Sequence, residues 1–156
     1  MDNEVVAPHA GQLVCLEGGK LVPCKDPSNF TAPYTILFFS AGWCPDCRKF
    51  SPGLVAAYDA QPAGHRGFEV LFISQDRSEA EMHKFMATEK MHWPALAYSQ
   101  VPGAHDLEKF HPKKSIPWLT VIDRSGQVKF QSESDKDANE VLKALQAKLA
   151  ADGKRK

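Results

Sequence analysis

The sequence predicts a single α/β domain, in which helices cover both faces of a central mixed β-sheet. The chain has 156 residues, a suitable length for one domain with an adequate core. Two dense apolar runs, 34–40 and 68–74, enclose a helical pattern, which indicates a β-α-β unit. A hairpin pattern and an apolar helical stripe follow downstream. We expect one domain over residues 1–156, with its core at about 12–150.

The first predicted element is a small N-terminal β-hairpin. Residues 12–16 and 20–22 flank Gly18-Gly19, a pair typical of a two-residue hairpin loop. Such a loop places Cys15 and Cys24 diagonally on one face. We expect two half-buried apolar side chains there rather than a disulfide.

A buried central strand is predicted over 34–40, where aromatic and β-branched residues are dense. Pro45 suits the first position of a helix, which we expect to run to about Tyr58, with Pro52 inside it. The second strand is predicted at 68–74. Ser78 and Glu81 then form a capping-box pattern, and the helix that they start should end near Lys90.

The remaining segments predict shorter elements and a last helix. Residues 91–100 look irregular, and 103–110 suggest a short helix. Two strands, 118–123 and 127–131, flank a turn. A helix starting at Ser134 carries the apolar stripe Val141, Leu142, Leu145 and Leu149, and residues 153–156 form a frayed tail.

Composition and charge exclude several classes of protein. Nineteen Lys and Arg balance nineteen Asp and Glu, so nucleic acid is a poor partner. No apolar stretch approaches the ~18 residues that span a bilayer, so we expect no membrane association. Residues 1–10 lack the apolar region of a signal peptide. We therefore expect a cytoplasmic protein, or a periplasmic or exported one if a leader was removed.

The chemistry is concentrated in Cys44-Pro45-Asp46-Cys47, at the transition from strand to helix. Cys44 lies at the predicted helix N-terminus, where free N–H groups and the helix dipole favour a thiolate. Cys47 follows one turn later on the same face, within reach of the Cys44 sulfur. This pattern predicts that Cys44 attacks a disulfide and that Cys47 resolves the mixed disulfide.

Other uses of these cysteines fit less well. A zinc site needs two close pairs or added histidines, and Cys15 and Cys24 are too far apart for one such pair. Covalent haem attachment needs His after the second cysteine, where Arg48 stands. We expect no metal and no bound organic cofactor.

A strand opens at Ile116-Pro117-Trp118, although proline cannot donate to a sheet ladder. A cis Ile116–Pro117 peptide would resolve this conflict and would bring backbone groups to the Cys44 sulfur, but most X-Pro bonds are trans.

The segment from Phe38 to Pro52, FFSAGWCPDCRKFSP, resembles the thioredoxin superfamily and most closely its tryparedoxin and nucleoredoxin branch. The likeness extends through 68–74 and 115–117. It implies a thioredoxin-like fold, a cis Pro117 and thiol–disulfide exchange. It also implies that Trp43, Pro45, Asp46, Ile116 and Pro117 position the substrate around Cys44 and Cys47.

The resemblance implies an oxidoreductase that reduces disulfides in protein substrates and is itself reduced by a dithiol or a reductase. The alternative is a redox-sensitive binding module of the nucleoredoxin type, with little turnover.

This sequence departs from the branch at three places. Asp46 replaces a proline, and its carboxylate should disfavour the Cys44 thiolate and make the protein more reducing. Phe38 stands where many thioredoxins have a buried Asp, so Cys47 must exchange its proton with water or another group. Residues 75–77 read Gln-Asp-Arg where the branch often has Trp-Asp-Glu, so partner contacts of relatives need not transfer.

Overall fold

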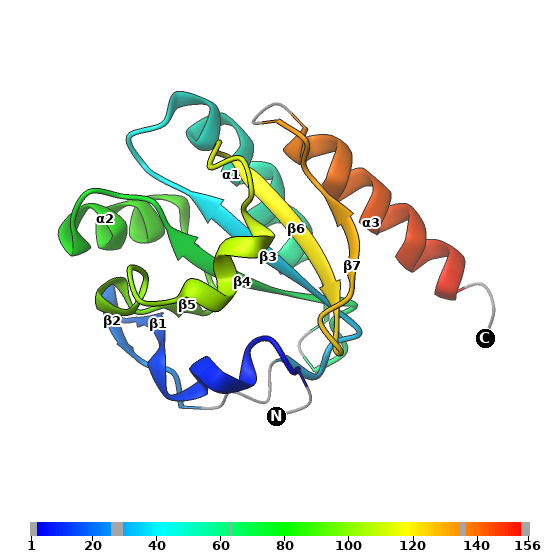
Figure 1. The fold of residues 1–156 in the computed structure, drawn as a ribbon, viewed down its shortest axis with the longest axis horizontal. Helices are drawn as coiled ribbons and strands as arrows, with labels where there is room; N and C mark the ends of the chain where they lie inside the picture. Colours follow the sequence, from blue (N-terminus) through cyan, green and yellow to red (C-terminus); the bar gives the residue numbers. More distant parts are fainter. Residues whose placement is uncertain (1–2, 26–29, 63, 135–136, 154–156) are drawn as a thin grey trace.

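The computed structural model describes residues 3–25, 30–62, 64–134 and 137–153. Within these ranges, seven strands form one mixed sheet in the order β2-β1-β5-β4-β3-β6-β7 (Figure 1). The strands are β1 (Leu13–Glu17), β2 (Lys20–Pro23), β3 (Tyr34–Ser40), β4 (Phe68–Ser74), β5 (Ala95–Leu96), β6 (Trp118–Asp123) and β7 (Val128–Gln131). The helices are α1 (Pro45–Asp59), α2 (Glu79–Glu89) and α3 (Ala138–Gly153), with 3-10 segments η1 (Ala7–Gln12), η3 (Tyr98–Gln100) and η4 (His105–Phe110).

The centre of the sheet is the predicted β-α-β unit. β3 pairs in parallel with β4, from Tyr34 opposite Phe68 to Ser40 opposite Ser74, and it pairs antiparallel with β6 on its other side. Because β3 has neighbours on both sides and is covered on both faces, nearly all of its residues are buried. This explains why the run is apolar throughout rather than alternating.

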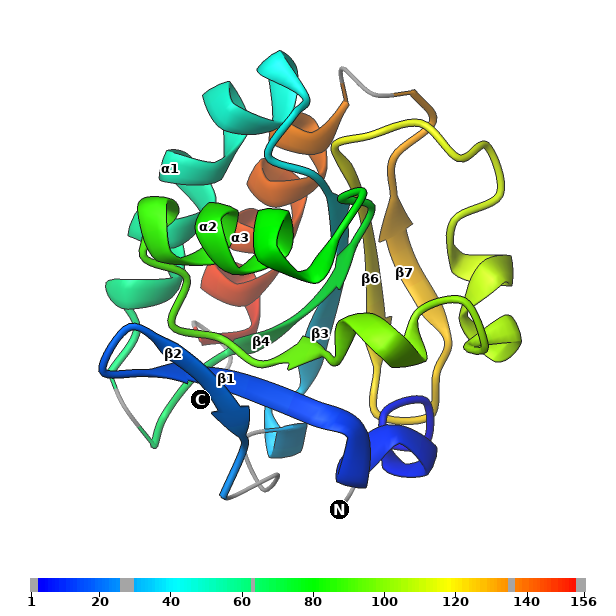
Figure 2. The ribbon, with the colours of Figure 1, turned by 90° about the vertical axis from the view of Figure 1, so that its left-hand side faces the viewer.

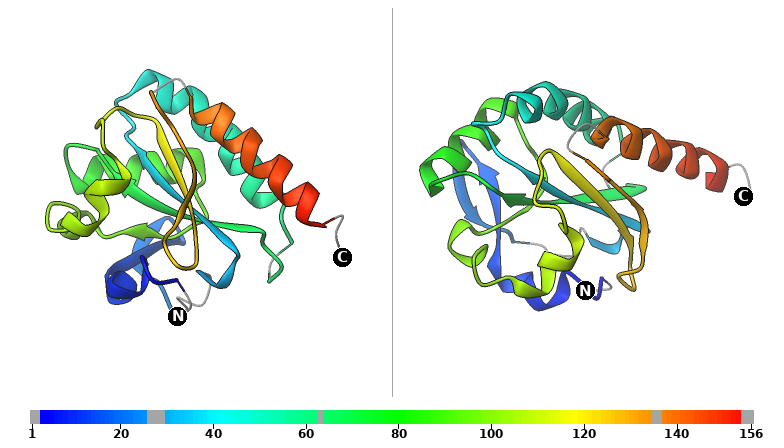
Figure 3. Two further views of the ribbon diagram at one scale, coloured as in Figure 1. Left: turned by 45° about the vertical axis from the view of Figure 1, so that its right-hand side comes forward. Right: turned by 45° about the horizontal axis from the view of Figure 1, so that its top comes forward.

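Helical segments cover both faces of the sheet, as expected, but unequally. Ile36 and Phe38 point into a core with α1, α2 and α3, which we call the helix-side core. Leu37 and Phe39 point into a second core, which includes residues of η4 and the N-terminal segment. Figure 2 shows the three labelled α-helices on one side of the sheet and the short 3-10 segments on the other. In both views of Figure 3, α1 and α3 run beside each other over the helix-side face.

The predicted helix boundaries hold for α1 and α2. The Ser78 hydroxyl accepts the Glu81 N–H at 3.1 Å, so Ser78 caps the helix as its part of the predicted capping box, and Lys90 ends α2 in the left-handed conformation. α3 begins at Ala138, four residues after the predicted Ser134. Residues 135–136, the loop residues 26–29 and the predicted frayed residues 154–156 lie outside the described ranges.

Residues 91–100 are more regular than predicted. Ala95 pairs with Phe72 of β4 in parallel and with Val14 of β1 antiparallel, so β5 joins the N-terminal hairpin to the main sheet. A two-residue strand is too short for an alternating pattern to appear in the sequence.

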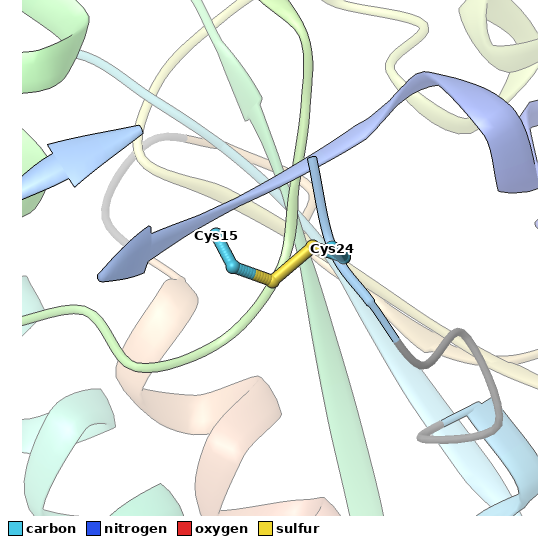
Figure 4. Close-up of a disulfide and its surroundings, with 2 residues drawn as sticks. All are labelled: Cys15 and Cys24. Carbon is cyan, nitrogen blue, oxygen red and sulfur yellow. A yellow bond between two sulfur atoms is a disulfide. The ribbon is translucent and has the colours of Figure 1, made fainter. Parts of the chain in front are cut away.

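The prediction for Cys15 and Cys24 is wrong, because the two cysteines form a disulfide (Figure 4). The two-residue hairpin loop is present, and Cys24 donates its N–H to Leu13, which places it diagonally from Cys15. A flat ladder would separate diagonal neighbours by about 7–8 Å. Here the Cα atoms are 5.2 Å apart, within disulfide range. Strong twist in a two-stranded ribbon shortens one diagonal, and the sequence pattern does not show this.

None of the helices that the structure describes is long and apolar enough to cross a membrane.

Candidate active site

The connection between β3 and α1 places Cys44 at the start of the helix. Cys44 is the N-cap residue, with extended backbone angles, and its sulfur accepts the Cys47 N–H at 3.3 Å. A sulfur that receives a helix N-terminal N–H is stabilised as an anion by this donor and by the helix dipole. The local geometry is therefore the one predicted for a nucleophilic thiolate at Cys44.

The two thiols differ in their surroundings. Cys44 retains 7% of its surface exposed, whereas Cys47 is fully buried. The pKa of Cys47 is raised to about 12, mainly by burial and in part by the neighbouring Cys44. A partner disulfide can therefore approach the Cys44 sulfur first, while Cys47 lies behind it.

The segment before β6 lies against the Cys44 sulfur. The Ile116–Pro117 peptide is cis, as the resemblance implied, and the Ile116 carbonyl oxygen is 3.8 Å from Cys44 Sγ. His111 fixes this segment, because its Nε2 lies 2.7 Å from the Ser115 carbonyl oxygen and its ring stacks on Phe39. Burial is the main cause that lowers the pKa of His111.

Trp43 is an exposed aromatic residue directly before Cys44, with 42% of its surface accessible. Its Nε1–H donates to the Gln75 carbonyl oxygen at 3.1 Å, and the Arg77 guanidinium lies 4.7 Å from the centre of its ring. Both contacts hold the indole in place while leaving part of it accessible to a partner.

Gly42 connects β3 with α1 at a point where the backbone passes close to the Phe85 side chain. A Cβ added there would lie 3.0 Å from the Cβ of Phe85 on α2. The Gly42 N–H donates to Asp76 Oδ1 at 2.8 Å, and Asp76 also accepts the Ser74 hydroxyl. Burial raises the pKa of Asp76, while these two hydrogen bonds oppose the rise.

A groove of about 510 Å³ lies beside Trp43, between this connection and α2. Trp43 and Phe85 give it apolar walls, and Arg48 and Lys84 bring positive charge. The other residues that line it are Gly42, Asp76, Glu81, Thr88 and Glu89.

The remaining predicted residues lie at the rim. Pro45 and Asp46 form the exposed first turn of α1, where a carboxylate faces the positive end of the helix dipole. The structure thus brings Cys44 and Cys47 together with Ile116, which is 72 residues away from Cys44 in the chain. Among the described residues, no group of three or more His, Cys, Asp or Glu side chains could hold a metal ion.

Sequence reasoning did not assign roles to Ser40, Asp76 and Arg77. A usable signal was present, because Ser40 ends β3 and residues 75–77 follow β4, which is parallel to it. The carboxyl ends of adjacent parallel strands meet at one edge of a sheet, where sites commonly form.

The sequence profile of the Thioredoxin-like family matches residues 33–128, more than half of the chain. Nucleoredoxin of Bos taurus is 31% identical over 119 residues, which are 76% of this chain and 26% of that protein. Tryparedoxin of Trypanosoma brucei brucei is 40% identical over 86 residues, 55% of this chain and 58% of that protein. The chain thus matches about a quarter of the length of the nucleoredoxins.

Solved structures give the same result over most of the chain. Tryparedoxin from Trypanosoma brucei superposes with a TM-score of 0.65 and 29% identity, covering 87% of this chain and 92% of that one. Tryparedoxin II complexed with glutathionylspermidine superposes with a TM-score of 0.68 and 28% identity, covering 92% and 95%. These matches confirm the fold and the branch that the motif around Cys44 predicted.

Proposed function

The chain belongs to the thioredoxin-like family, and from that premise we propose that it reduces disulfides in protein substrates through the Cys44–Cys47 dithiol. The observation that carries the proposal is the placement of Cys44. Its sulfur lies at the N-terminus of α1, accepts the Cys47 N–H and remains partly accessible beside the Ile116 carbonyl.

The first step is attack on the partner. The Cys44 thiolate bonds to one sulfur of the substrate disulfide, and the other sulfur leaves as a thiolate that takes up a proton. The Ile116 carbonyl oxygen lies against the reacting sulfur. In this proposal, the substrate chain is positioned by Ile116 together with Trp43, Pro45, Asp46 and Pro117.

The second step releases the product. Cys47 loses its proton, and its sulfur attacks Cys44 Sγ, so the mixed disulfide breaks while the Cys44–Cys47 disulfide forms. Two electrons have then passed from the dithiol to the substrate. A separate dithiol or a reductase returns them and restores both thiols. One tryparedoxin relative was solved with glutathionylspermidine, so low-molecular-weight thiols belong among the donors to be tried.

Insulin reduction driven by dithiothreitol tests the proposal. We expect the wild-type protein to accelerate insulin precipitation and Cys44→Ser to give only the uncatalysed rate. The matched variant is Cys15→Ser/Cys24→Ser, which removes the two disulfide-bonded cysteines outside the site and should retain the activity. A Cys44→Ser protein as active as wild type would overturn the assignment of the nucleophile.

The alternative function is a redox-sensitive binding module with little turnover, which the nucleoredoxin relatives bring into consideration. Turnover separates the two functions. If the wild-type protein fails to accelerate insulin reduction, Cys47→Ser should be used to trap partners as mixed disulfides. Trapped partners that the wild-type protein does not then reduce would favour the binding module.

A further inference from the structure

Ser40 is the last residue of β3, and its side chain points toward α1. Residues Ile36 and Phe38 of the same strand lie in the helix-side core, and Ser40 continues their alternation. Cys47 belongs to that core from the other side, in the first turn of α1. The strand end and the helix start therefore enclose the Ser40 hydroxyl and the Cys47 thiol together.

The Ser40 hydroxyl is buried and unpaired. Ser40 is fully buried, and its Oγ has no hydrogen-bond partner among the described residues. An unpaired buried hydroxyl costs free energy, so its presence requires an explanation. By contrast, the hydroxyls of Ser51 and Ser74, both also buried, donate to the Cys47 carbonyl oxygen and to Asp76.

The Cys47 thiol needs a group of this kind. Phe38 stands where a carboxyl group would assist Cys47 in many thioredoxins, and its ring is packed among Phe50, Phe72 and Trp93. Burial raises the pKa of Cys47, while the nearby Ser40 hydroxyl and the Ala41 backbone oppose the rise. The unpaired Ser40 hydroxyl thus gains a hydrogen-bond acceptor when the Cys47 thiolate forms.

We propose that Ser40 is a positioning residue for the second step of the reaction, whose hydroxyl donates to the Cys47 thiolate as this sulfur attacks Cys44. This role rests on the proposed function. The hydroxyl keeps its own proton. The proton that Cys47 loses is balanced by the one that the departing partner thiolate takes up, and the electrons move from Cys47 sulfur to the new bond with Cys44.

Few other groups act on Cys47. Cys44 is the titratable neighbour that faces it from its own helix. Asp46 and Arg48, on either side of Cys47 in the sequence, are exposed, and β3 contributes Ser40 and Phe38. If removal of the Ser40 hydroxyl changes the pH dependence of the second step, the change therefore reports on the proposed hydrogen bond between Ser40 and the Cys47 thiolate.

The test is the reaction of the reduced protein with 5,5′-dithiobis(2-nitrobenzoate), which needs no natural substrate. The first thionitrobenzoate released reports attack by Cys44, and the second reports resolution by Cys47. We expect Ser40→Ala to slow the second release about tenfold near neutral pH and to move its pH midpoint upward by about one unit, since one unit corresponds to a tenfold change in thiolate fraction. The first release should stay within twofold of wild type.

Two variants make the result specific. Ser51→Ala removes another buried hydroxyl near Cys47, one that donates to its backbone rather than to its sulfur, and it should leave both releases unchanged. Ser40→Thr retains the hydroxyl and should restore the second release. An unchanged second release in Ser40→Ala would overturn the role of Ser40, as would a Ser40→Thr variant that is as slow as Ser40→Ala. Failure of the proposed function would give a different result from failure of the role of Ser40. The wild-type protein would then release no second thionitrobenzoate through Cys47, and Cys47→Ser would behave like wild type.

Discussion

At the scale of single residues, the site assigns different tasks to two identical side chains by their surroundings. Cys44 sits at a helix N-terminus with a donor on its sulfur, and Cys47 lies in the helix-side core, where burial raises its pKa to about 12. A thiol is a nucleophile only as a thiolate. In the reaction proposed above, the order of the two steps therefore follows from the placement of the two cysteines and not from their residue type.

Asp46, in the exposed first turn of α1, is expected to affect the reduction potential of the Cys44–Cys47 pair. Its carboxylate competes with the Cys44 thiolate for the positive end of the helix dipole, so removing it should stabilise the reduced protein. We expect Asp46→Pro to have a less negative reduction potential than wild type, by about 10–20 mV, which corresponds to a charge–dipole interaction of about 0.5–1 kcal/mol. Equilibration against glutathione buffers measures it. An unchanged potential, or one that is more negative, would contradict the prediction.

Glu69 is a buried acid at the other end of β4 from the site. It is fully buried, and its Oε1 accepts the Val70 N–H while its Oε2 lies 4.0 Å from Arg66. Burial raises its pKa to about 7, against the smaller opposing effects of Val70, Tyr58 and Arg66. The folded protein therefore retains this proton at a pH at which an unfolded chain, with an ordinary Glu pKa, has lost it.

The consequence is a stability that falls as the pH rises. Because the pKa of Glu69 is raised, the folded state binds more protons than the unfolded state between the two pKa values. The contribution of Glu69 to the free energy of unfolding therefore decreases between about pH 4.5 and pH 7 and is constant at higher pH. We expect Glu69→Gln to remove this decrease and to gain on the order of 2–3 kcal/mol relative to wild type between pH 5 and 8.

Urea unfolding at pH 5 and pH 8 measures the effect of Glu69. Glu133→Gln changes an exposed carboxyl group and should follow the wild-type pH dependence. If Glu69→Gln lost as much stability between the two pH values as wild type does, the carboxyl group would not be the cause.

At the scale of elements, the N-terminal hairpin is the part least held by the sheet. β1 reaches β5 through Leu13 and Val14, and β5 pairs with β4 through one register position. The Cys15–Cys24 disulfide joins the two hairpin strands where these sheet contacts are few (Figure 4). The central strands, by contrast, pair over six or seven positions on each side of β3.

We expect the double variant Cys15→Ser/Cys24→Ser to lose about 2–3 kcal/mol of unfolding free energy, the value expected for cross-linking residues nine apart in sequence. Urea unfolding measures the loss, and hydrogen exchange should show faster opening of β1 and β2 while β3 stays protected. Exchange accelerated equally in β3 would mean that the disulfide supports the whole fold rather than the hairpin.

At the scale of the whole molecule, the sheet separates two cores and carries the site at one edge. α1, α2 and α3 pack on one face, and the second core lies under η4 and the N-terminal segment (Figure 2). β3 supplies side chains to both cores and ends at Ser40, directly before the loop to Cys44. The proposed nucleophile, Cys44, thus follows a strand of which six of the seven residues are buried.

Local signals predicted much of this arrangement. The apolar runs of β3 and β4, the proline at the start of α1 and the capping box of α2 each depend on neighbours within a few residues, so the sequence pattern reports them directly. The two residues of β5 were not predicted, because their pairing with β4 and β1 makes them a strand. The start of α3 at Ala138 was also missed, since helix ends are less sharply marked in a sequence than helix interiors.

The sequence by itself determined the fold family and the reactive pair, since Cys44-Pro45-Asp46-Cys47 between an apolar strand and a helix is a local pattern whose chemistry depends on the helix N-terminus. Only the tertiary structure decided what surrounds that pair. It brought Arg77 over Trp43 and Ser40 into the core with Cys47, and it closed the Cys15–Cys24 disulfide. The physical reason is that these contacts depend on strand order, twist and burial, which chain segments far apart in sequence establish together.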